Sequence, residues 1–523
     1  MKNKYLYIVL FGTLLGVSSC NEDTYLNEIP RNVLTADNLY LTPSGFENGL
    51  NAAYSLVRLE RDTYGKENMR SVFAVAGTDT YYLSRFASQD IFFTAWGSYM
   101  NSTSFGLNEN WTWLYQIINS VNTIIDRSEN ESIKWSSQNQ KNEIVAQARC
   151  IRAWAYRHLT YCWGDVPLTL HESTGANIKT DWNRAPKTEV MKTMEEDWLF
   201  AEQYLPDIQL IPGRLNKVVA QHYLAELYLA IGDPTKAEIK AMAAINNPNY
   251  ALITARFGIN KSKPGVPFMD QFYTENVFHK NGNTEVLWEF PYDRNVLGGG
   301  ANIMRRVWLV RYSSISGVTA IMSTMGRGSD FLSVTNFGLN LYEASDDRGS
   351  GYAIHRSFLK DNGTIVYTNV GTVLEPKTDT YRPSTAKWDD GDPNDPAANN
   401  GYHDQPYLRL AETYLLLAEA QLLLKKPDLA AETLNKIRKR SNASPITAAQ
   451  VNIDFILDER ARELLTEEHR RYTLLRLNKW IERTKLFNNQ CGSYITERDK
   501  LYPIPQPVID ANLDSKMPQN SGY

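Results

Sequence analysis

The sequence predicts a mostly α-helical protein in which a loop-rich insertion interrupts a helical scaffold. Apolar residues recur at helical spacing in the first half and the last quarter of the 523-residue chain, and the stretch between them is rich in Gly, Ser, Asn and Asp. Hydrophobic residues make up 43% of the chain and charged residues 22%, which is ordinary for a globular protein and excludes a wholly disordered one. The formal net charge of −4 provides no basic field, so no nucleic-acid partner is expected.

The first nineteen residues, 1–19, are expected to be a signal peptide and not part of the fold. Two lysines precede an uncharged stretch over 5–17, which is too short to span a bilayer but has the length of a signal-peptide hydrophobic region. The stretch leads into the sequence VSSC, which resembles a bacterial lipobox and implies cleavage before Cys20 and lipidation of its sulfur. Ordinary secretion with an incidental cysteine is the alternative. Because no second long apolar run follows, we expect residues 20–523 to be soluble and tethered through Cys20 alone.

Three apolar stripes predict the first long helices. They run through residues 46–57, 111–125 and 144–159, and the third helix is expected to stop at Gly164. Each stripe needs a partner surface, so these helices are expected to pack on one another. The third helix carries two cysteines twelve positions apart, about 18 Å along its axis. That separation excludes a disulfide, and both are expected to be buried.

Two later segments have the spacing of a tetratricopeptide (TPR) helix–turn–helix unit. The segment 218–248 has small residues at positions 225, 237 and 244, which let two antiparallel helices approach closely, and a Gly-Asp-Pro turn at 232–234. A second copy starts near 407 and keeps small residues at 418 and 430. The copies are 193 residues apart, so they form no continuous array. We expect a scaffold over about 40–250 and 405–490 and a loop-rich, ligand-binding insertion over about 250–405, with short strands at 285–292 and 305–312.

Several motifs in this chain resemble those of the SusD/RagB family. They are ARCIRAWAY at 148–156 with YCWGDVPL at 161–168, YLRLAETYLLLAEA at 407–420, ERAREL at 459–464, and LYPIP at 501–505 followed by Asn512. Together with the lipobox and the TPR spacing, the resemblance runs from Cys20 to the C-terminus. One departure is Glu468, which stands where the family usually has Gly. It is interpreted as a change at a helix position without effect on function.

The resemblance implies a SusD-like domain over 20–523 and a surface-exposed lipoprotein of the outer membrane. Such proteins usually capture an oligosaccharide nutrient and cover a SusC-like TonB-dependent transporter, with the helical face packed on the transporter and the loop-rich face holding the ligand. No cofactor and no catalytic group are implied. Two alternatives stay open: RagB-like relatives bind peptides with the same architecture and partner, and a TPR-like scaffold can serve protein partners.

A sugar site needs flat aromatic faces for the apolar side of a pyranose and polar side chains for its hydroxyls, because an unpaired buried hydroxyl costs about 1–3 kcal/mol. The resemblance places such sites in the irregular segment near 80–105 and in the insertion. Trp96 is the predicted stacking platform and Asn101 its hydroxyl-binding partner. The further candidates are Tyr81, Tyr82, Tyr99, Trp308 and Tyr312. Each ring could instead pack in the core, where Trp111, Trp113, Trp154 and Trp288 are expected.

The sequence contains no recognisable catalytic or metal motif. Its seven histidines form no HExxH pattern, there is no GxSxG elbow, and the glycine triplet at 298–300 lacks the GK[ST] of a phosphate loop. A glycosidase carboxylate pair stays open as a minor alternative, because one sequence cannot pair residues across a cleft. The run from Asp390 begins like a calcium loop but lacks its Gly and its closing Glu, so it is interpreted as a solvated turn.

Overall fold

The structure is a computed structural model that is mostly helical, as predicted. It describes residues 35–64, 68–83, 96–310, 315–318, 328–367, 382–389 and 398–523. The predicted signal peptide, Cys20, Tyr312 and the run from Asp390 lie outside these ranges. In the described part of the chain, no helix is both long enough and apolar enough to cross a membrane.

Nine helices of eleven or more residues build the described scaffold. They are α4 (Pro43–Arg58), α7 (Phe105–Arg127), α8 (Gln138–Trp163), α9 (Lys187–Tyr204), α10 (Lys217–Ala230), α11 (Pro234–Ile245), α15 (Leu410–Leu423), α16 (Pro427–Arg440) and α17 (Ile453–Glu463). The predictions for 46–57, 111–125 and 144–159 are confirmed by α4, α7 and α8. The third helix ends where expected, because Gly164 adopts φ +75°, a conformation that favours glycine.

Shorter helices and strands complete the described fold. The helices are α3 (Ala36–Leu39), α5 (Val72–Val75), α6 (Trp96–Tyr99), α12 (Pro267–Asp270), α13 (Met304–Trp308), α14 (Asn336–Leu339), α18 (Arg470–Arg476), α19 (Trp480–Phe487) and α20 (Gln506–Ala511). The strands are β1 (Thr63–Tyr64), β2 (Asn68–Met69), β3 (Tyr81–Leu83), β4 (Val286–Phe290), β5 (Leu332–Val334), β6 (Ile354–His355), β7 (Ser357–Leu359), β8 (Ile365–Tyr367), β9 (Ser384–Thr385) and β10 (Gln405–Arg409).

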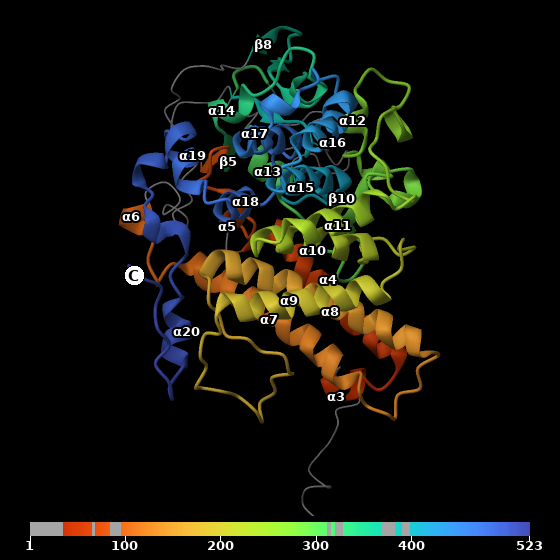
Figure 1. Ribbon diagram of the computed structural model, residues 1–523, viewed down its shortest axis with the longest axis vertical. Coiled ribbons are helices and arrows are strands. Elements are labelled where there is room, and N and C mark those ends of the chain that lie inside the picture. The colour runs from red at the N-terminus through yellow and green to blue at the C-terminus, as the bar shows by residue number, and fades with distance from the viewer. Residues whose placement is uncertain are drawn as a thin grey trace, which may run out of the picture.

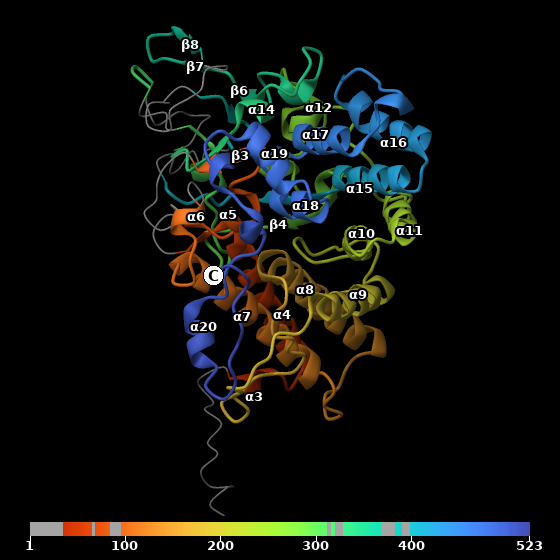
Figure 2. The ribbon, with the colours of Figure 1, turned by 60° about the vertical axis from the view of Figure 1, so that its left-hand side comes forward.

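The two TPR-like copies are the helix pairs α10/α11 and α15/α16. Asp233 caps α11 by accepting a hydrogen bond from the Lys236 amide, and Pro234 occupies the first helical position. The small residues Ala237, Ala241 and Ala244 are fully buried. Although 193 residues separate the copies in the sequence, α11 packs directly against α15. The helices α7 to α11, α15 and α16 therefore follow one another in space (Figure 2), so the prediction that the copies form no continuous array holds only for the sequence.

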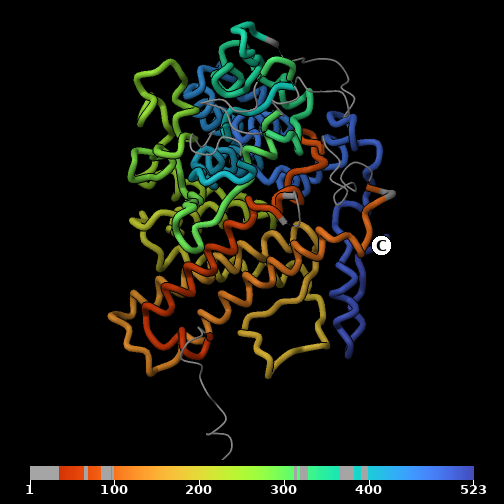
Figure 3. The backbone as a smooth tube through the Cα atoms, turned by 180° about the vertical axis from the view of Figure 1, so that it is seen from behind, coloured from red at the N-terminus to blue at the C-terminus, as the bar shows by residue number. Residues whose placement is uncertain are grey.

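The insertion and the helices α15 to α19 lie at one end of the molecule, and α4, α7, α8, α9 and the last helix, α20, lie at the other (Figures 1 and 3). The predicted strand at 285–292 is confirmed by β4, which pairs antiparallel with β10. The predicted strand at 305–312 is wrong, because its first residues belong to the helix α13. Met304, Val307 and Trp308 are all buried, and their i, i+3, i+4 spacing is that of one helical face.

A fully buried network of charged side chains joins the insertion to the scaffold. Glu463 at the end of α17 accepts hydrogen bonds from Arg348, at 3.1 Å, from Arg409, at 2.9 Å, and from Arg440. Glu285, just before β4, binds Arg409 at 2.6 Å and Arg440 at 2.9 Å. These five side chains are at most 1% exposed. The neighbouring arginines hold the pKa of Glu463 well below its usual range, although burial alone would raise it.

Glu468, the departure from the family pattern, lies in the turn between α17 and α18 and not at a helix position as predicted. Its buried carboxylate accepts hydrogen bonds from Arg460 and Arg470, both at 2.8 Å. Arg470 in turn forms a bidentate pair with Asp79, which fixes the segment before β3. Cys150 and Cys162 are buried and unbridged, as predicted.

Candidate ligand-binding groove

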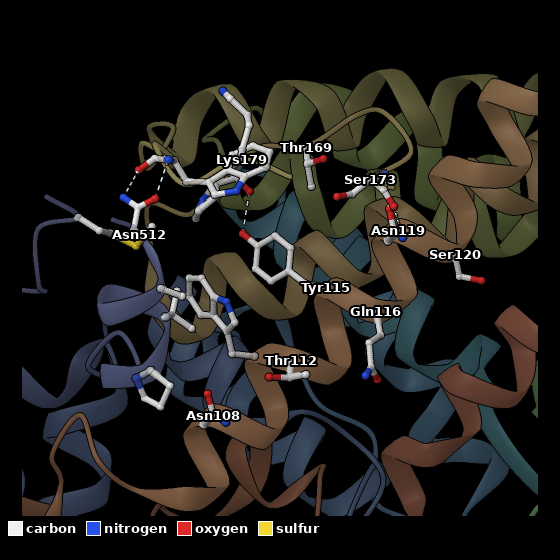
Figure 4. A pocket seen from close by; sticks show the side chains of 17 residues that line it. Asn108, Thr112, Tyr115, Gln116, Asn119, Ser120, Thr169, Ser173, Lys179 and Asn512 are labelled. Atoms are coloured by element: carbon white, nitrogen blue, oxygen red, sulfur yellow. Dashed lines mark hydrogen bonds between the residues drawn. The ribbon is translucent and has the colours of Figure 1, made fainter. Parts of the chain in front are cut away.

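A groove of about 750 Å³ lies between α7, the 164–186 segment that joins α8 to α9, and α20 with the residues after it. Figure 4 shows this groove from close by. Its size is that of a site for a small organic ligand. The lining residues are Asn108, Trp111, Thr112, Tyr115, Gln116, Asn119, Ser120, Pro167, Thr169, Ser173, Lys179, Trp182, Pro507, Val508, Ala511, Asn512 and Met517.

The α7 wall presents uncharged polar side chains at helical spacing. Asn108, Thr112, Gln116 and Asn119 point from the same side of α7 and extend over about 16 Å, at 1.5 Å per residue (Figure 4). The rings of Trp111 and Tyr115 lie beside this row, with centroids 5.1 Å apart. The wall thus combines aromatic surface with amide and hydroxyl groups.

The opposite wall is fixed to α7 and to the C-terminal segment by hydrogen bonds. The Tyr115 hydroxyl donates a hydrogen bond to the Pro167 carbonyl, at 2.7 Å. Asn119 accepts from the Ser173 amide at 2.7 Å. The Asn512 side chain accepts from the Trp182 amide at 2.7 Å and donates to the Trp182 carbonyl at 2.9 Å, so it pairs with the backbone as a neighbouring strand would. The backbone of Trp182 is therefore held through both its amide and its carbonyl.

The described lining of the groove is almost uncharged. Among the described residues that line the groove, none is an acid or a histidine, and Lys179 carries the single charge. Burial raises the pKa of Tyr115 well above its usual value, so this phenol stays neutral. The described lining therefore contains no carboxylate pair of the kind that glycoside hydrolysis requires.

Comparisons with known proteins agree with this architecture. Residues 357–523 match the model of the SusD family, and residues 52–229 match a model described as "Starch-binding associating with outer membrane". A SusD-like protein of Formosa agariphila is 25% identical over the full length of both chains. This chain is a member of the SusD-like family.

Solved SusD-like structures share the fold of this chain. A SusD homolog from Bacteroides thetaiotaomicron has a TM-score of 0.74 and 19% identity, covering 93% of this chain and 98% of the homolog. A laminarin-binding SusD-like protein has a TM-score of 0.70 and 21% identity, covering 92% and 99%. The surface glycan-binding protein A of Bacteroides uniformis has a TM-score of 0.71 and 19% identity, covering 91% and 99%.

The predicted stacking platform of this SusD-like chain is a core residue. Trp96 is 0% exposed, and its ring lies parallel to that of Tyr502, with centroids 5.9 Å apart. The Trp480 ring meets it edge-on at 5.3 Å, and the Arg471 guanidinium lies 5.6 Å from its centroid. The prediction that Trp96 offers a ring face to solvent is therefore corrected: the ring packs in the core against Tyr502 and Trp480.

Other predicted site residues are also buried in the described structure. Tyr81, Tyr82 and Trp308 are 1–3% exposed, and the rings of Tyr81 and Trp308 meet edge-on at 5.0 Å. Tyr81 lies on β3, which pairs with β5, so these residues join the irregular segment to the insertion. The core positions expected for Trp111, Trp113, Trp154 and Trp288 are confirmed, although Trp111 also reaches the groove.

Two predicted residues are exposed close to the groove. Tyr99 is 46% exposed, and Asn101 donates a hydrogen bond to the Tyr99 carbonyl at 2.9 Å. The carbonyl of the next residue, Ser102, accepts a hydrogen bond from the Gln506 amide at 2.8 Å, which places this segment against α20. Tyr99 and Asn101 therefore remain predicted ligand contacts, at one end of the groove.

The sequence did contain a signal for the groove. On α7, an exposed helical face would ordinarily be charged, yet positions 108, 112, 116, 119 and 120 are all uncharged and polar. Such a face, next to Trp111 and Tyr115, is typical of a surface that binds hydroxyl-rich ligands. Two segments that carry the family resemblance, 161–168 and 501–512, contribute to or border the groove.

Proposed function

We propose that this SusD-like protein is a lipoprotein of the outer membrane, anchored at the cell surface through Cys20, that binds an oligosaccharide nutrient and delivers it to a SusC-like TonB-dependent transporter. The observation that carries the proposal is the groove, which joins aromatic rings to a row of amide and hydroxyl groups without an acid. A pyranose presents an apolar face and a rim of hydroxyls, so it matches both kinds of surface.

The proposal includes binding without turnover. Family membership supports carbohydrate as the ligand, and the neutral lining supports capture over hydrolysis. Incubation of the purified protein with candidate oligosaccharides is expected to leave their chain lengths unchanged. New reducing ends that increase with protein concentration and persist after repurification would reveal an acid pair elsewhere.

The decisive experiment is calorimetric titration of glycans and peptides into the protein and its Trp182→Ala variant. Trp182 suits this substitution because its ring lines the groove while its backbone is held by Asn512. Removing the ring should therefore leave the backbone of this wall in place. Loss of a central aromatic typically costs 2 kcal/mol or more, so affinity should fall roughly thirtyfold at about 1.4 kcal/mol per decade.

The matched control is Tyr494→Ala, which removes a 50% exposed ring outside the groove and should leave affinity unchanged. Binding of peptides and not of glycans would favour the RagB-like alternative. Glycan binding that is indifferent to Trp182→Ala would move the site away from the groove.

A further inference from the structure

We propose that the groove selects oligosaccharides that carry an acidic group, a carboxylate or a sulfate, and that Lys179 recognises that group. This inference rests on the proposed function and adds the chemical class of the ligand. It starts from the charge of the lining: Lys179 is the single charged residue among the described residues that line the groove.

The ammonium group of Lys179 lies at the rim, above the indole of Trp182 (Figure 4). Its Nζ is 4.8 Å from the centroid of the Trp182 ring. A ligand that extends along the polar row of α7 and reaches Trp182 therefore arrives beneath a cation. The ring and the ammonium form one contact surface, which is apolar below and positive above.

The protein's own partner for Lys179 holds it weakly. Asp181 Oδ1 lies 3.6 Å from Nζ, and the two side chains are 54% and 56% exposed. An exposed pair at this distance adds little stabilisation and is screened by salt. An anion bound in the groove would instead receive a direct charge-assisted hydrogen bond, which is about twice as strong as a neutral one. The ligand's acid is thus expected to displace Asp181.

The neighbouring acid does not compete for the ammonium. The carboxylate of Asp514 accepts a hydrogen bond from the Thr180 hydroxyl. The backbone amide of Asp514 donates a second one to the Thr180 carbonyl, at 2.9 Å. Together with the Asn512–Trp182 pair, this contact pins the backbone on either side of Asp181. Lys179 therefore projects from a backbone segment that is already held in place, so binding has to order only its side chain.

The test uses three oligosaccharides of one backbone: the neutral chain, its uronate form and its sulfate ester. Affinities are measured by calorimetry at low and high salt for the wild type, Lys179→Gln and Lys179→Arg. We expect the wild type to bind at least one acidic form about tenfold more tightly than the neutral chain at low salt, and this preference to shrink at high salt. Lys179→Gln should lower the affinity for the preferred acidic form to about that for the neutral chain, and Lys179→Arg should keep the preference. Whichever acidic form is preferred identifies the source of the charge.

The matched control is Lys192→Gln on α9, which removes a 76% exposed lysine outside the groove and should retain the preference. Equal wild-type affinity for neutral and acidic chains would overturn the inference while leaving the proposed function intact. The same holds if Lys179→Gln weakens all three ligands equally, since Lys179 would then act by packing. Failure of the wild type to bind any of a wide panel of neutral and acidic glycans would instead overturn the proposed function.

Discussion

Replacing Trp96 with alanine should cost stability and leave ligand affinity unchanged. The side chain is fully buried between the rings of Tyr502 and Trp480, and Gly77 approaches so closely that a Cβ there would lie 2.7 Å from the indole. A tryptophan buries about 150–250 Å² of surface, which at about 25 cal/mol per Å² corresponds to roughly 4–6 kcal/mol. Large-to-small changes of this kind typically cost about 3–5 kcal/mol.

The substitution also removes one of the three aromatic rings that surround a buried cation. The guanidinium of Arg471 lies 4.3 Å from the Tyr502 ring, 4.8 Å from the Trp480 ring and 5.6 Å from the Trp96 ring. Among the described residues, its Nε and Nη1 have no hydrogen-bond partner. Its Nη2 donates to the Asp499 carbonyl at 2.7 Å and to the Lys500 carbonyl at 3.1 Å. The three rings add to this compensation of the buried charge, and each such contact contributes up to about 2 kcal/mol when desolvated. We expect a total loss of about 3–5 kcal/mol in the free energy of unfolding.

Urea unfolding and calorimetric titration of one variant test this reasoning. The unfolding midpoint of Trp96→Ala should fall clearly, while glycan affinity stays within twofold of the wild type. Tyr99→Ala is the matched control, because it removes a 46% exposed ring from the same short helix and should change stability by no more than about 0.5 kcal/mol. An unchanged midpoint with lost affinity would refute the core assignment and return Trp96 to the binding site.

Three further predictions concern charge and anchoring. Glu463→Gln should destabilise the protein by about 3–5 kcal/mol in urea unfolding, because it removes the one carboxylate that Arg348, Arg409 and Arg440 share in a fully buried network; a wild-type midpoint would contradict this. Burial raises the pKa of Glu289 to about 7, so the folded state retains a proton that the unfolded state loses, and stability should decline as the pH rises from about 4.5 to 7. Glu289→Gln should remove that part of the decline, with midpoints that match the wild type at pH 4 and exceed it at pH 8. Cys20→Ala should yield soluble protein with unchanged glycan affinity; its retention in membranes after a salt wash would show a second anchor.

The helices were predictable because their signal is local. The stripes that became α4, α7 and α8 depend on residues three or four positions apart, and the small residues of the TPR-like pairs identify a close helix contact by themselves. The role of Trp96 was not predictable in the same way. Its partners Tyr502 and Trp480 lie about 400 residues away in the sequence, and nothing local separates a ring that plugs a loop from one that meets a sugar.

The groove shows the same limit. Its α7 wall was present in the sequence as an uncharged polar face, but the opposite wall depends on contacts between distant residues, such as the pairing of Asn512 with Trp182 across 330 positions. The prediction of a strand where the helix α13 lies is wrong for a different reason. Its five residues are too few for a periodic pattern to distinguish a helix from a strand, and burial of Met304, Val307 and Trp308 decided the outcome.

Because α11 and α15 are in direct contact, the insertion leaves the helical scaffold and rejoins it at nearly the same place. The free-energy cost of closing such a loop rises only slowly with its length, by about 0.6 kcal/mol for each doubling. The helical spine can therefore tolerate insertions and deletions in the exposed loops of the insertion at small thermodynamic cost, provided that the buried ion pairs of Glu285, Arg348 and Arg409 are kept. Engineered chimaeras could exchange these loops as cassettes, and so acquire a new outer surface without redesigning the helices that carry it.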